Sequence, residues 1–359
     1  MRRGVIRALR AFVRPPIQIP DTYDFSDAKL LLLRQDLIGD ALISTPLIRA
    51  LHNTYPRARI HLLLSSMNYF VFDNHPAISK RWVFQKNPYS IARLLSNIRA
   101  ERYDFVIDLL DNSSATSTLL TLLAGARWKV GLQKENDFVY DIVRSQGSKQ
   151  QIHVAERTLQ LASAFRINPA TIQGRVEYFT STDSERFAQK IWRKRQLDNR
   201  PVVGVNISAG EETRSWWRES CRDTLLSIAD IHSEAQFVLL HKPSHRFRAD
   251  DLRSRVKNAI VVSTASFDQA AAIVKRLSIL ITPDTSIVQL ASVFQVPSIV
   301  LHIQTSEKHG HLWSPFRSPS EDIVAQHDNL DTIPAREIVA AFERLWISRR
   351  VAAREYFNV

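Results

Sequence analysis

The sequence predicts an α/β protein with two doubly wound domains that face a central cleft, each built on a parallel sheet. Apolar runs typical of strands alternate with segments of helical spacing along most of the chain, and the alternation starts again at Pro201. Strands that alternate with helices form parallel sheets. A chain of 359 residues is also longer than one ordinary hydrophobic core, so two domains are expected.

The first half of the chain begins its alternation with a continuous apolar run from Lys29 to Arg34. Such a run is typical of a strand that is buried on both faces. We expect further strands over residues 59–65, 103–109 and 127–132, and helices over 41–52, 118–124 and 153–165. The segment 168–182 is expected to link the two domains.

The second half repeats the pattern. We expect strands over residues 202–207, 236–241, 259–263, 278–282 and 297–302, and helices over 222–232, from 244, over 267–277 and over 287–294. The predicted organisation is an arm over 1–23, a domain over 24–175 and a domain over 176–359, whose final helices pack back on the first domain.

Composition excludes several classes of protein. An apolar content of 45% and a charged content of 23% are those of a folded globular protein. The single cysteine, Cys221, excludes an internal disulfide framework and a metal site built on cysteines, and secretion is not expected. No apolar run reaches the roughly 20 residues that span a bilayer.

The net charge of +12 is concentrated in part at the N-terminus. Drawn as a helix, the first 14 residues place Val5, Ile6, Leu9, Phe12 and Val13 on one face and Arg3, Arg7, Arg10 and Arg14 on the other. Pro15 and Pro16 then end the helix. A basic amphipathic helix favours binding to an anionic membrane surface. A frayed tail and a helix packed on the domain are the alternatives.

The most informative residue is Asp40, which follows Gly39 after the first predicted strand. We expect both residues on the strand-to-helix loop, where open α/β sheets bind ligands. A carboxylate at that position can take a proton from a substrate hydroxyl. The alternative is that Asp40 only caps the following helix.

The second half carries two loops suited to phosphate. Asn206 and Ser208 follow a predicted strand, and the basic residue Arg214 comes shortly after. The segment Asp284-Thr285-Ser286 stands at the start of a predicted helix, whose free N–H groups and dipole favour an anion. It is also an ordinary capping sequence. Two such loops opposite an acid in the other domain favour transfer from a nucleotide-activated donor.

The sequence lacks the motifs that are typical of several other kinds of chemistry. There is no P-loop, no G-x-G-x-x-G and no G-x-S-x-G. The histidines lack zinc-type spacing, the pair His309 and His311 included, so no metal and no cofactor are expected. Nucleic acid is not an expected partner, because the aromatic residues form no stacking motif.

Taken together, these motifs resemble a known family. The matching segments are Leu31–Arg34, Ile38–Leu42, Thr45-Pro46 with Leu51, Tyr103–Leu109, Leu123–Ala126, Val130-Gly131, His153–Arg157, Val203–Asn206, Arg214–Trp216 and Asp284–Ser286 with Ala291 and Pro297. In this order they resemble the ADP-heptose:lipopolysaccharide heptosyltransferases of glycosyltransferase family 9, over about residues 29 to 345.

The resemblance implies a GT-B fold of two Rossmann-like domains. It also implies inverting, metal-independent transfer of heptose from ADP-L-glycero-β-D-manno-heptose to a lipopolysaccharide core, on the cytoplasmic face of the inner membrane. The first domain would bind this lipid-linked acceptor, with Asn112 and Ser113 near it, and the second domain the nucleotide sugar. By the resemblance, Asp40 is the general base, Arg214 the diphosphate-binding residue, and Asp284 and Thr285 the donor-binding pair.

Several positions depart from the family pattern. Ser286 replaces a glycine and Gln289 replaces a histidine, although both side chains can still donate a hydrogen bond to a donor. The acid that often holds the ribose is absent after the strand ending at His241, where Lys242, Ser244, His245 and Arg246 stand. No lysine follows closely after Asp108. These departures keep two alternatives open, a related transferase using another nucleotide sugar and a catalytically inactive binding homologue.

Overall fold

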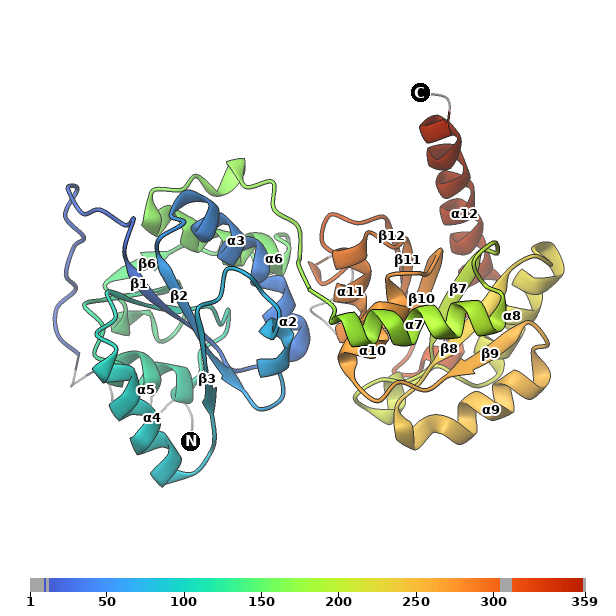
Figure 1. The fold of residues 1–359 in the computed structure, drawn as a ribbon, viewed down its shortest axis with the longest axis horizontal. Helices are drawn as coiled ribbons and strands as arrows, with labels where there is room; N and C mark the ends of the chain where they lie inside the picture. The colour runs from blue at the N-terminus through green and yellow to red at the C-terminus, as the bar shows by residue number, and fades with distance from the viewer. Residues whose placement is uncertain (1–9, 11–12, 304–311, 358–359) are drawn as a thin grey trace. The chain divides into compact units, whose positions relative to one another are not determined.

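A computed structural model describes the chain at residue 10 and over residues 13–303 and 312–357, with side chains as far as residue 348. The chain divides into two compact units, Met1–Phe179 and Thr180–Val359. Each unit holds one six-stranded parallel sheet with helices packed on it (Figure 1). The predicted class, two doubly wound α/β domains, is confirmed.

The first sheet has the strand order β3-β2-β1-β4-β5-β6. Its strands are β1 (Lys29–Arg34), β2 (Arg59–Ser65), β3 (Lys80–Phe84), β4 (Phe105–Asp108), β5 (Trp128–Leu132) and β6 (Ile142–Arg144). Its α-helices are α2 (Ile38–Ile43), α3 (Thr45–Thr54), α4 (Pro88–Ala100), α5 (Ala115–Leu123) and α6 (Val154–Leu159). Short 3₁₀ turns cover Tyr69–Phe72, Asp137–Val139, Gln160–Phe165 and Pro169–Thr171.

The second sheet has the order β12-β11-β10-β7-β8-β9. Its strands are β7 (Val202–Asn206), β8 (Gln236–Leu240), β9 (Ala259–Val262), β10 (Ile279–Pro283), β11 (Ser298–His302) and β12 (Ser320–Val324). Its α-helices are α7 (Thr182–Arg195), α8 (Glu219–Ile231), α9 (Arg246–Arg255), α10 (Phe267–Val274), α11 (Ser286–Phe294) and α12 (Ala335–Phe357). Further 3₁₀ turns cover Glu212–Arg214, Pro243–His245 and Leu330–Thr332.

Both sheets therefore follow the same path. Numbered from the first strand of its own unit, each sheet has the order 3-2-1-4-5-6, with a topological switch point between the first and fourth strands. In such sheets ligands bind beyond the carboxyl ends of the strands at the switch point. The ends of β1 and β4, and of β7 and β10, are thus where each unit can hold a substrate.

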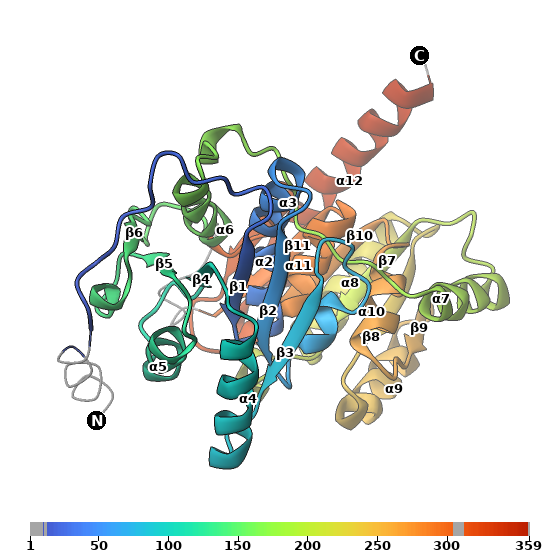
Figure 2. The same cartoon turned by 60° about the vertical axis from the view of Figure 1, so that its left-hand side comes forward.

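Burial on both faces explains the apolar strands. All six residues of β1 are buried, and so are all five of β7. On one face of the first sheet Leu31 and Leu33 pack with Leu94 of α4 and Leu120 of α5. Figure 2 shows α4 and α5 on that face and α3 and α6 on the other. The helices thereby cover both faces, as continuous apolar strands require.

Some predicted elements were wrong in detail. The helix expected over 41–52 is two helices, α2 and α3, which meet at Ser44 before the Thr45-Pro46 pair. The helix expected over 153–165 is α-helical only as far as Leu159 and then becomes a 3₁₀ turn. Strands β3, β6 and β12 and helices α4 and α7 were not predicted.

The two chain ends are only partly described. Residues 1–9 and 11–12 of the predicted N-terminal arm lie outside the described residues. The later part of the arm is held on the first unit, since Arg14 contacts Asp141 at 3.2 Å and the Ile17 N–H donates to the same carboxylate at 3.0 Å. At the other end Phe342 and Trp346 of α12 belong to the core of the second unit.

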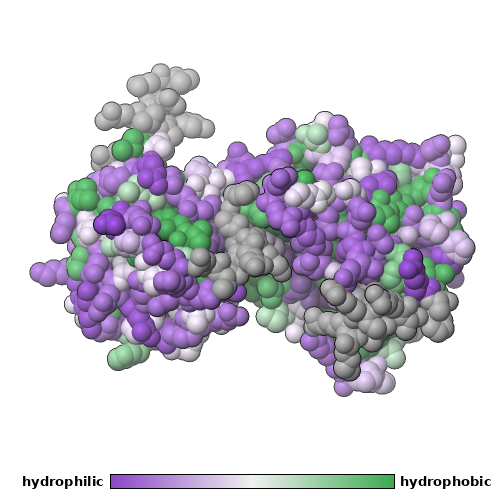
Figure 3. Space-filling model, turned by 180° about the vertical axis from the view of Figure 1, so that it is seen from behind, coloured by the Kyte–Doolittle hydropathy of each residue, from purple (hydrophilic) through white to green (hydrophobic). Residues whose placement is uncertain are grey.

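No helix among the described residues is long and apolar enough to cross a bilayer. On the face shown in Figure 3, apolar residues form small separate patches within a mostly hydrophilic surface.

Candidate functional site

Asp40 lies in the first turn of α2, at the switch point of the first sheet. The prediction that it lies in the preceding loop was wrong, because the helix already begins at Ile38. The residue before the helix is Leu37, and no side chain caps the helix start. The alternative of a simple capping role for Asp40 therefore finds no support, and the residue is half-buried.

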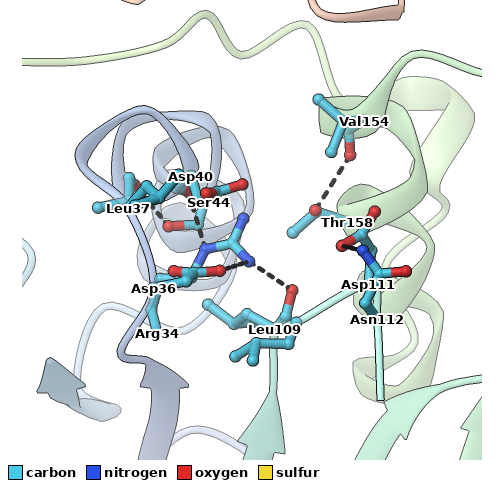
Figure 4. A network of polar contacts seen from close by, with 12 residues as sticks. Arg34, Asp36, Leu37, Asp40, Ser44, Leu109, Asp111, Asn112, Val154 and Thr158 are labelled. Atoms are coloured by element: carbon cyan, nitrogen blue, oxygen red, sulfur yellow. Dashed lines mark hydrogen bonds and ion pairs between the residues drawn. The ribbon is translucent and has the colours of Figure 1, made fainter. Parts of the chain in front are cut away.

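Arg34 organises the surroundings of Asp40. It is the last residue of β1 and is 1% exposed. Its Nε donates to the Asp40 backbone carbonyl at 2.8 Å, and its Nη1 donates to the Leu109 carbonyl at 2.8 Å and to Asp36 Oδ2 at 3.2 Å (Figure 4). One guanidinium thus joins β1, the start of α2 and the end of β4.

The acidic surroundings change the ionisation of Asp40. Burial, reinforced by the neighbouring Asp36 carboxylate, raises the pKa of Asp40 to about 7, although Arg34 opposes the shift. Burial likewise raises the pKa of Asp36. A carboxyl group that gains and loses its proton near neutral pH suits a general base.

The loop after β4 carries the expected acceptor residues Asn112 and Ser113, next to Asp111. The exposed Asn112 accepts a hydrogen bond from Lys149 Nζ at 2.9 Å, and Asp111 pairs with Arg157 at 3.2 Å. The structure therefore brings cations to this loop that the local sequence does not contain, from positions 149 and 157.

A buried ion pair between Lys134 and Asp108, the last residue of β4, lies at the start of the same loop. Lys134 Nζ lies 3.1 Å from Asp108 Oδ2, with side chains 3% and 0% exposed. The Tyr140 hydroxyl donates to the same oxygen at 2.6 Å, and Lys134 also bonds to the Leu110 carbonyl. The sequence holds no lysine directly after Asp108, and no spacing signal pointed to Lys134.

In the second unit, Asn206 and Thr285 meet at the switch point. Asn206 is the last residue of β7, and its Nδ2 donates to Thr282 Oγ1 at 3.0 Å and to Thr285 Oγ1 at 3.3 Å. Thr285 is the N-cap of α11, where its hydroxyl accepts from the Ile287 N–H. The capping interpretation of this segment is thus correct, and it leaves Ser286 as the first residue of the nine-residue helix α11.

Arg214 and Asp284 line one small pocket. Leu301, Ile303 and Leu330 complete its walls. The Arg214 Nε lies 3.5 Å from Glu211 Oε2, a loose contact. Next to the pocket lies the buried His302. Its Nε2 lies 2.8 Å from Asp322 Oδ1, and its Nδ1 lies 3.9 Å from Asp284 Oδ2. The predicted basic residue and the predicted donor-binding acid therefore come together.

Two other predicted donor residues are engaged within the protein. Ser208 Oγ lies 2.8 Å from His245 Nδ1 and accepts from the Lys242 N–H. Gln289 is buried and its amide donates to the Trp313 carbonyl at 3.1 Å. Gln289 thus binds the segment after β11, and Ser208 joins the loops after β7 and β8.

A larger cavity lies at the carboxyl ends of β8 and β9. Its volume is about 470 Å³, and its walls are Phe187, His241, Pro243, Arg246, Ser263, Thr264, Ala265 and Gln269. Ser263 is held between His241 at 3.1 Å and Arg246 at 2.7 Å. This cavity is large enough for a nucleoside, and sequence reasoning missed most of its residues because they are distant in sequence.

In the part of the chain that the structure describes, no group of three or more His, Cys, Asp or Glu side chains is arranged to hold a metal ion. His309 and His311 lie outside the described residues.

Comparison with known proteins adds to this geometry. The model of glycosyltransferase family 9 (heptosyltransferase) matches residues 91–328. Lipopolysaccharide heptosyltransferase 3 of Escherichia coli K12 is 22% identical over 338 residues, which cover 86% of this chain and 95% of that protein.

Solved structures show the same fold. A family 9 glycosyl transferase from Veillonella parvula superposes with a TM-score of 0.76 at 16% identity, covering 91% of this chain and 99% of that one. The E. coli heptosyltransferase WaaC with ADP gives 0.70 at 17% identity, covering 88% and 99%. The family model spans well over half of the chain, so this protein belongs to glycosyltransferase family 9, the heptosyltransferases, and is a glycosyltransferase.

Proposed function

We propose that this enzyme transfers a heptose from ADP-L-glycero-β-D-manno-heptose to a lipopolysaccharide core acceptor, with inversion at the anomeric carbon. The observation that carries the proposal is that Arg214 and Asp284 line the same small pocket of the second unit. The resemblance to ADP-heptose transferases implies that both residues belong to the donor site. One relative in the same family was solved with ADP-2-deoxy-2-fluoro heptose, at 17% identity.

The donor half of the proposal rests on electrostatics. A diphosphate near Arg214 would gain a charge-assisted hydrogen bond. The nine-residue helix α11, which begins at Ser286, adds N–H groups and the positive end of its dipole. Both interactions strengthen as negative charge develops on the departing diphosphate, so they favour the transition state over the bound donor. The cavity that contains His241 and Ser263 would hold the nucleoside.

The acceptor half of the proposal assigns the base to Asp40. Its carboxylate takes the proton of the acceptor hydroxyl as that oxygen forms a bond to the anomeric carbon. The bond from the anomeric carbon to the diphosphate oxygen breaks on the opposite side, and ADP leaves with the electron pair. Asn112 and Ser113 lie on the loop after β4 and would contact the acceptor sugar.

The proposed base sets the direction of the pH dependence. Asp40 acts only when ionised, and its pKa is raised to about 7. The kcat/KM should therefore rise with pH through the neutral range and level off above it, since such profiles report groups of the free enzyme. A flat profile between pH 5.5 and 8.5 would argue against Asp40 as the base.

Three variants and a chelator test the proposal by turnover of ADP-heptose. Asp40→Asn should bind the donor normally and lose about 10²-fold or more in turnover. Arg214→Ala and Asp284→Ala should raise the donor KM or lower kcat. EDTA should leave activity unchanged. Near-normal turnover by Asp40→Asn would remove it from the mechanism, and a requirement for Mg²⁺ or Mn²⁺ would replace this account of leaving-group stabilisation.

One observation favours a second candidate, a related transferase using another nucleotide sugar. No carboxylate is among the residues that line the nucleoside-sized cavity, where the family often has an acid for the ribose. A melting-temperature screen with ADP, UDP, GDP and CDP separates the candidates, because a ligand that binds only the folded state stabilises it. Stabilisation by ADP without any turnover would indicate a catalytically inactive binding homologue.

We also propose that the enzyme acts as a peripheral protein on the inner face of the inner membrane. The supporting observation is the excess of arginine in the first 14 residues, together with a lipid-linked acceptor. Each arginine near an anionic surface contributes about 1 kcal/mol of attraction.

A further inference from the structure

The carboxylates around the proposed base outnumber the cations. Asp36 and Asp111 lie on the loops after β1 and β4, and Asp40 lies in the first turn of α2, close to the buried Arg34 (Figure 4). A second buried arginine, Arg157, contacts Asp111. Arg34 pairs with Asp36 at 3.2 Å, and Arg157 pairs with Asp111 at 3.2 Å. Among the described residues no cation lies within ion-pair distance of the Asp40 carboxylate. One acid of the three is left unpaired, and it is the proposed base.

Hydrogen bonds to other groups hold the guanidinium group of Arg34 away from the Asp40 carboxylate. Its Nε reaches the backbone carbonyl of Asp40, and Nη1 is shared between Asp36 and the Leu109 carbonyl. With its side chain 2% exposed, Arg34 has no room to swing toward another partner. Arg34 thus fixes the position of α2 without neutralising the carboxylate that α2 carries.

The position of Asp36 is fixed as well. The Asn68 side-chain amide donates to the Arg34 carbonyl at 2.8 Å and to the Asp36 carbonyl at 3.3 Å, which holds the loop after β1 against the loop after β2. The second carboxylate oxygen of Asp36 is buried and accepts no hydrogen bond. The fold therefore holds a carboxylate with one unsolvated oxygen near Asp40.

We propose that Asp36 is a positioning residue that occupies Arg34 and so keeps the carboxylate of Asp40 without a cationic partner. The role of Asp36 in catalysis rests on the proposed function, whereas its effect on the ionisation of Asp40 does not. Asp36 acts on the reaction through Asp40 and touches no substrate.

The charged groups that face Asp40 belong to β1, to the loop after β1 and to the loop after β4. Their effects on the pKa of Asp40 agree with the inference. Burial first, then Asp36 and Asp111, raise its pKa to about 7, and Arg34 lowers it. Asp36→Asn keeps an oxygen that can accept from Arg34, removes one negative charge and leaves the charge of Arg34 uncompensated. Both changes favour the ionised form of Asp40.

A titration that needs no substrate tests the inference directly. The full-length protein, labelled with ¹³C at aspartate carboxyl carbons, is titrated by NMR, and Asp40→Asn identifies the Asp40 signal. Asp36→Asn should lower the midpoint of that signal by about one pH unit or more. Asp27→Asn is the matched control, because Asp27 pairs with Arg57 on the surface of the same unit with side chains 73% and 70% exposed. An equal midpoint in wild type and Asp36→Asn overturns the inference.

Kinetics give a second readout that a merely structural role would not move. In Asp36→Asn the acid limb of the kcat/KM profile should shift to lower pH, and the plateau should fall because the base is weaker. A one-unit shift from pKa 7 raises the ionised fraction at pH 6 about fivefold. Loss of activity at all pH values with an unshifted limb overturns the inference. A shifted NMR midpoint in a protein that does not turn over ADP-heptose instead refutes the proposed function alone.

Discussion

Replacing Lys134 by methionine should destabilise the first unit strongly, because the change breaks a buried ion pair. Met fills the space of the aliphatic stem but cannot donate to Asp108, whose side chain is fully buried. Two donors then remain for the carboxylate, the Tyr140 hydroxyl at 2.6 Å and the Leu110 N–H at 3.1 Å. Burial and the Asp108 carboxylate raise the pKa of Tyr140 well above its usual value, so its hydroxyl keeps its proton and still donates.

The magnitude follows from these contacts. Removing one partner of a buried pair costs about 3–5 kcal/mol in the free energy of unfolding. Because two donors still satisfy Asp108, we expect the lower end, about 3 kcal/mol. With a urea slope of about 2 kcal/mol per M, the unfolding midpoint of the unit should fall by about 1.5 M. Adding Asp108→Asn removes the unpaired charge and should restore at least half of the loss.

Hydrogen exchange pulses along a urea titration provide the assay, since peptides from each sheet report on their own unit. Peptides from β4 and β5 should become unprotected at lower urea, and those from β7 and β10 should not move. The reasoning is that loss of Lys134 leaves Asp108 as a buried charge without a cation. A loss in the free energy of unfolding below about 1 kcal/mol, or no recovery in the double variant, would refute it.

Three further predictions concern packing, capping and the arm. Gly204→Ala should cost about 1–3 kcal/mol, because its Cβ would stand 2.1 Å from Leu277 Cδ1, whereas Gly210→Ala meets open space and should be near neutral by thermal melting. Thr285→Ala should lower the stability of the second unit by about 1 kcal/mol through the lost N-cap, measured by urea unfolding, and an unchanged midpoint would contradict this. Deleting residues 1–12, which keeps the contact of Arg14 with Asp141, should abolish co-sedimentation with anionic vesicles. High salt should have the same effect on the intact chain. Equal pelleting of the intact and shortened proteins would exclude the arm as the anchor.

The sequence predicted strands well where both faces are buried and poorly elsewhere. β1 and β7 are continuous apolar runs, so burial and sequence carry the same signal. The edge strand β3, Lys-Arg-Trp-Val-Phe, has no fully buried residue and begins with two charged residues, so it lacks the apolar run that identifies a buried strand. Helix α7 is strongly polar, and its buried stripe of Ser184, Ala188 and Trp192 includes only two apolar residues. Neither pattern stands out without the sheet that it packs on.

The candidate site was predicted only as far as motifs reach. Asp40, Arg214 and Asp284 were found because each follows a recognisable strand. Lys149 and Arg157 were not linked to the loop after β4, since the sheet brings them there from 37 and 46 residues beyond Asn112 and Asp111. The inward turn of Gln289 depends on the position of the Trp313 carbonyl, which no local pattern encodes.

The two switch points share a feature that bears on how the family diversifies. In each sheet the last residue of the first strand reaches across to the fourth: Arg34 donates to Leu109 at the end of β4, and Asn206 donates to Thr282 of β10. Both hydrogen bonds are donated by strand residues and not by residues of the loops that follow. The loops can therefore be replaced without separating the strands of the sheet. Such an architecture is evolvable, since new donors and acceptors can be sampled by loop exchange while the scaffold stays intact.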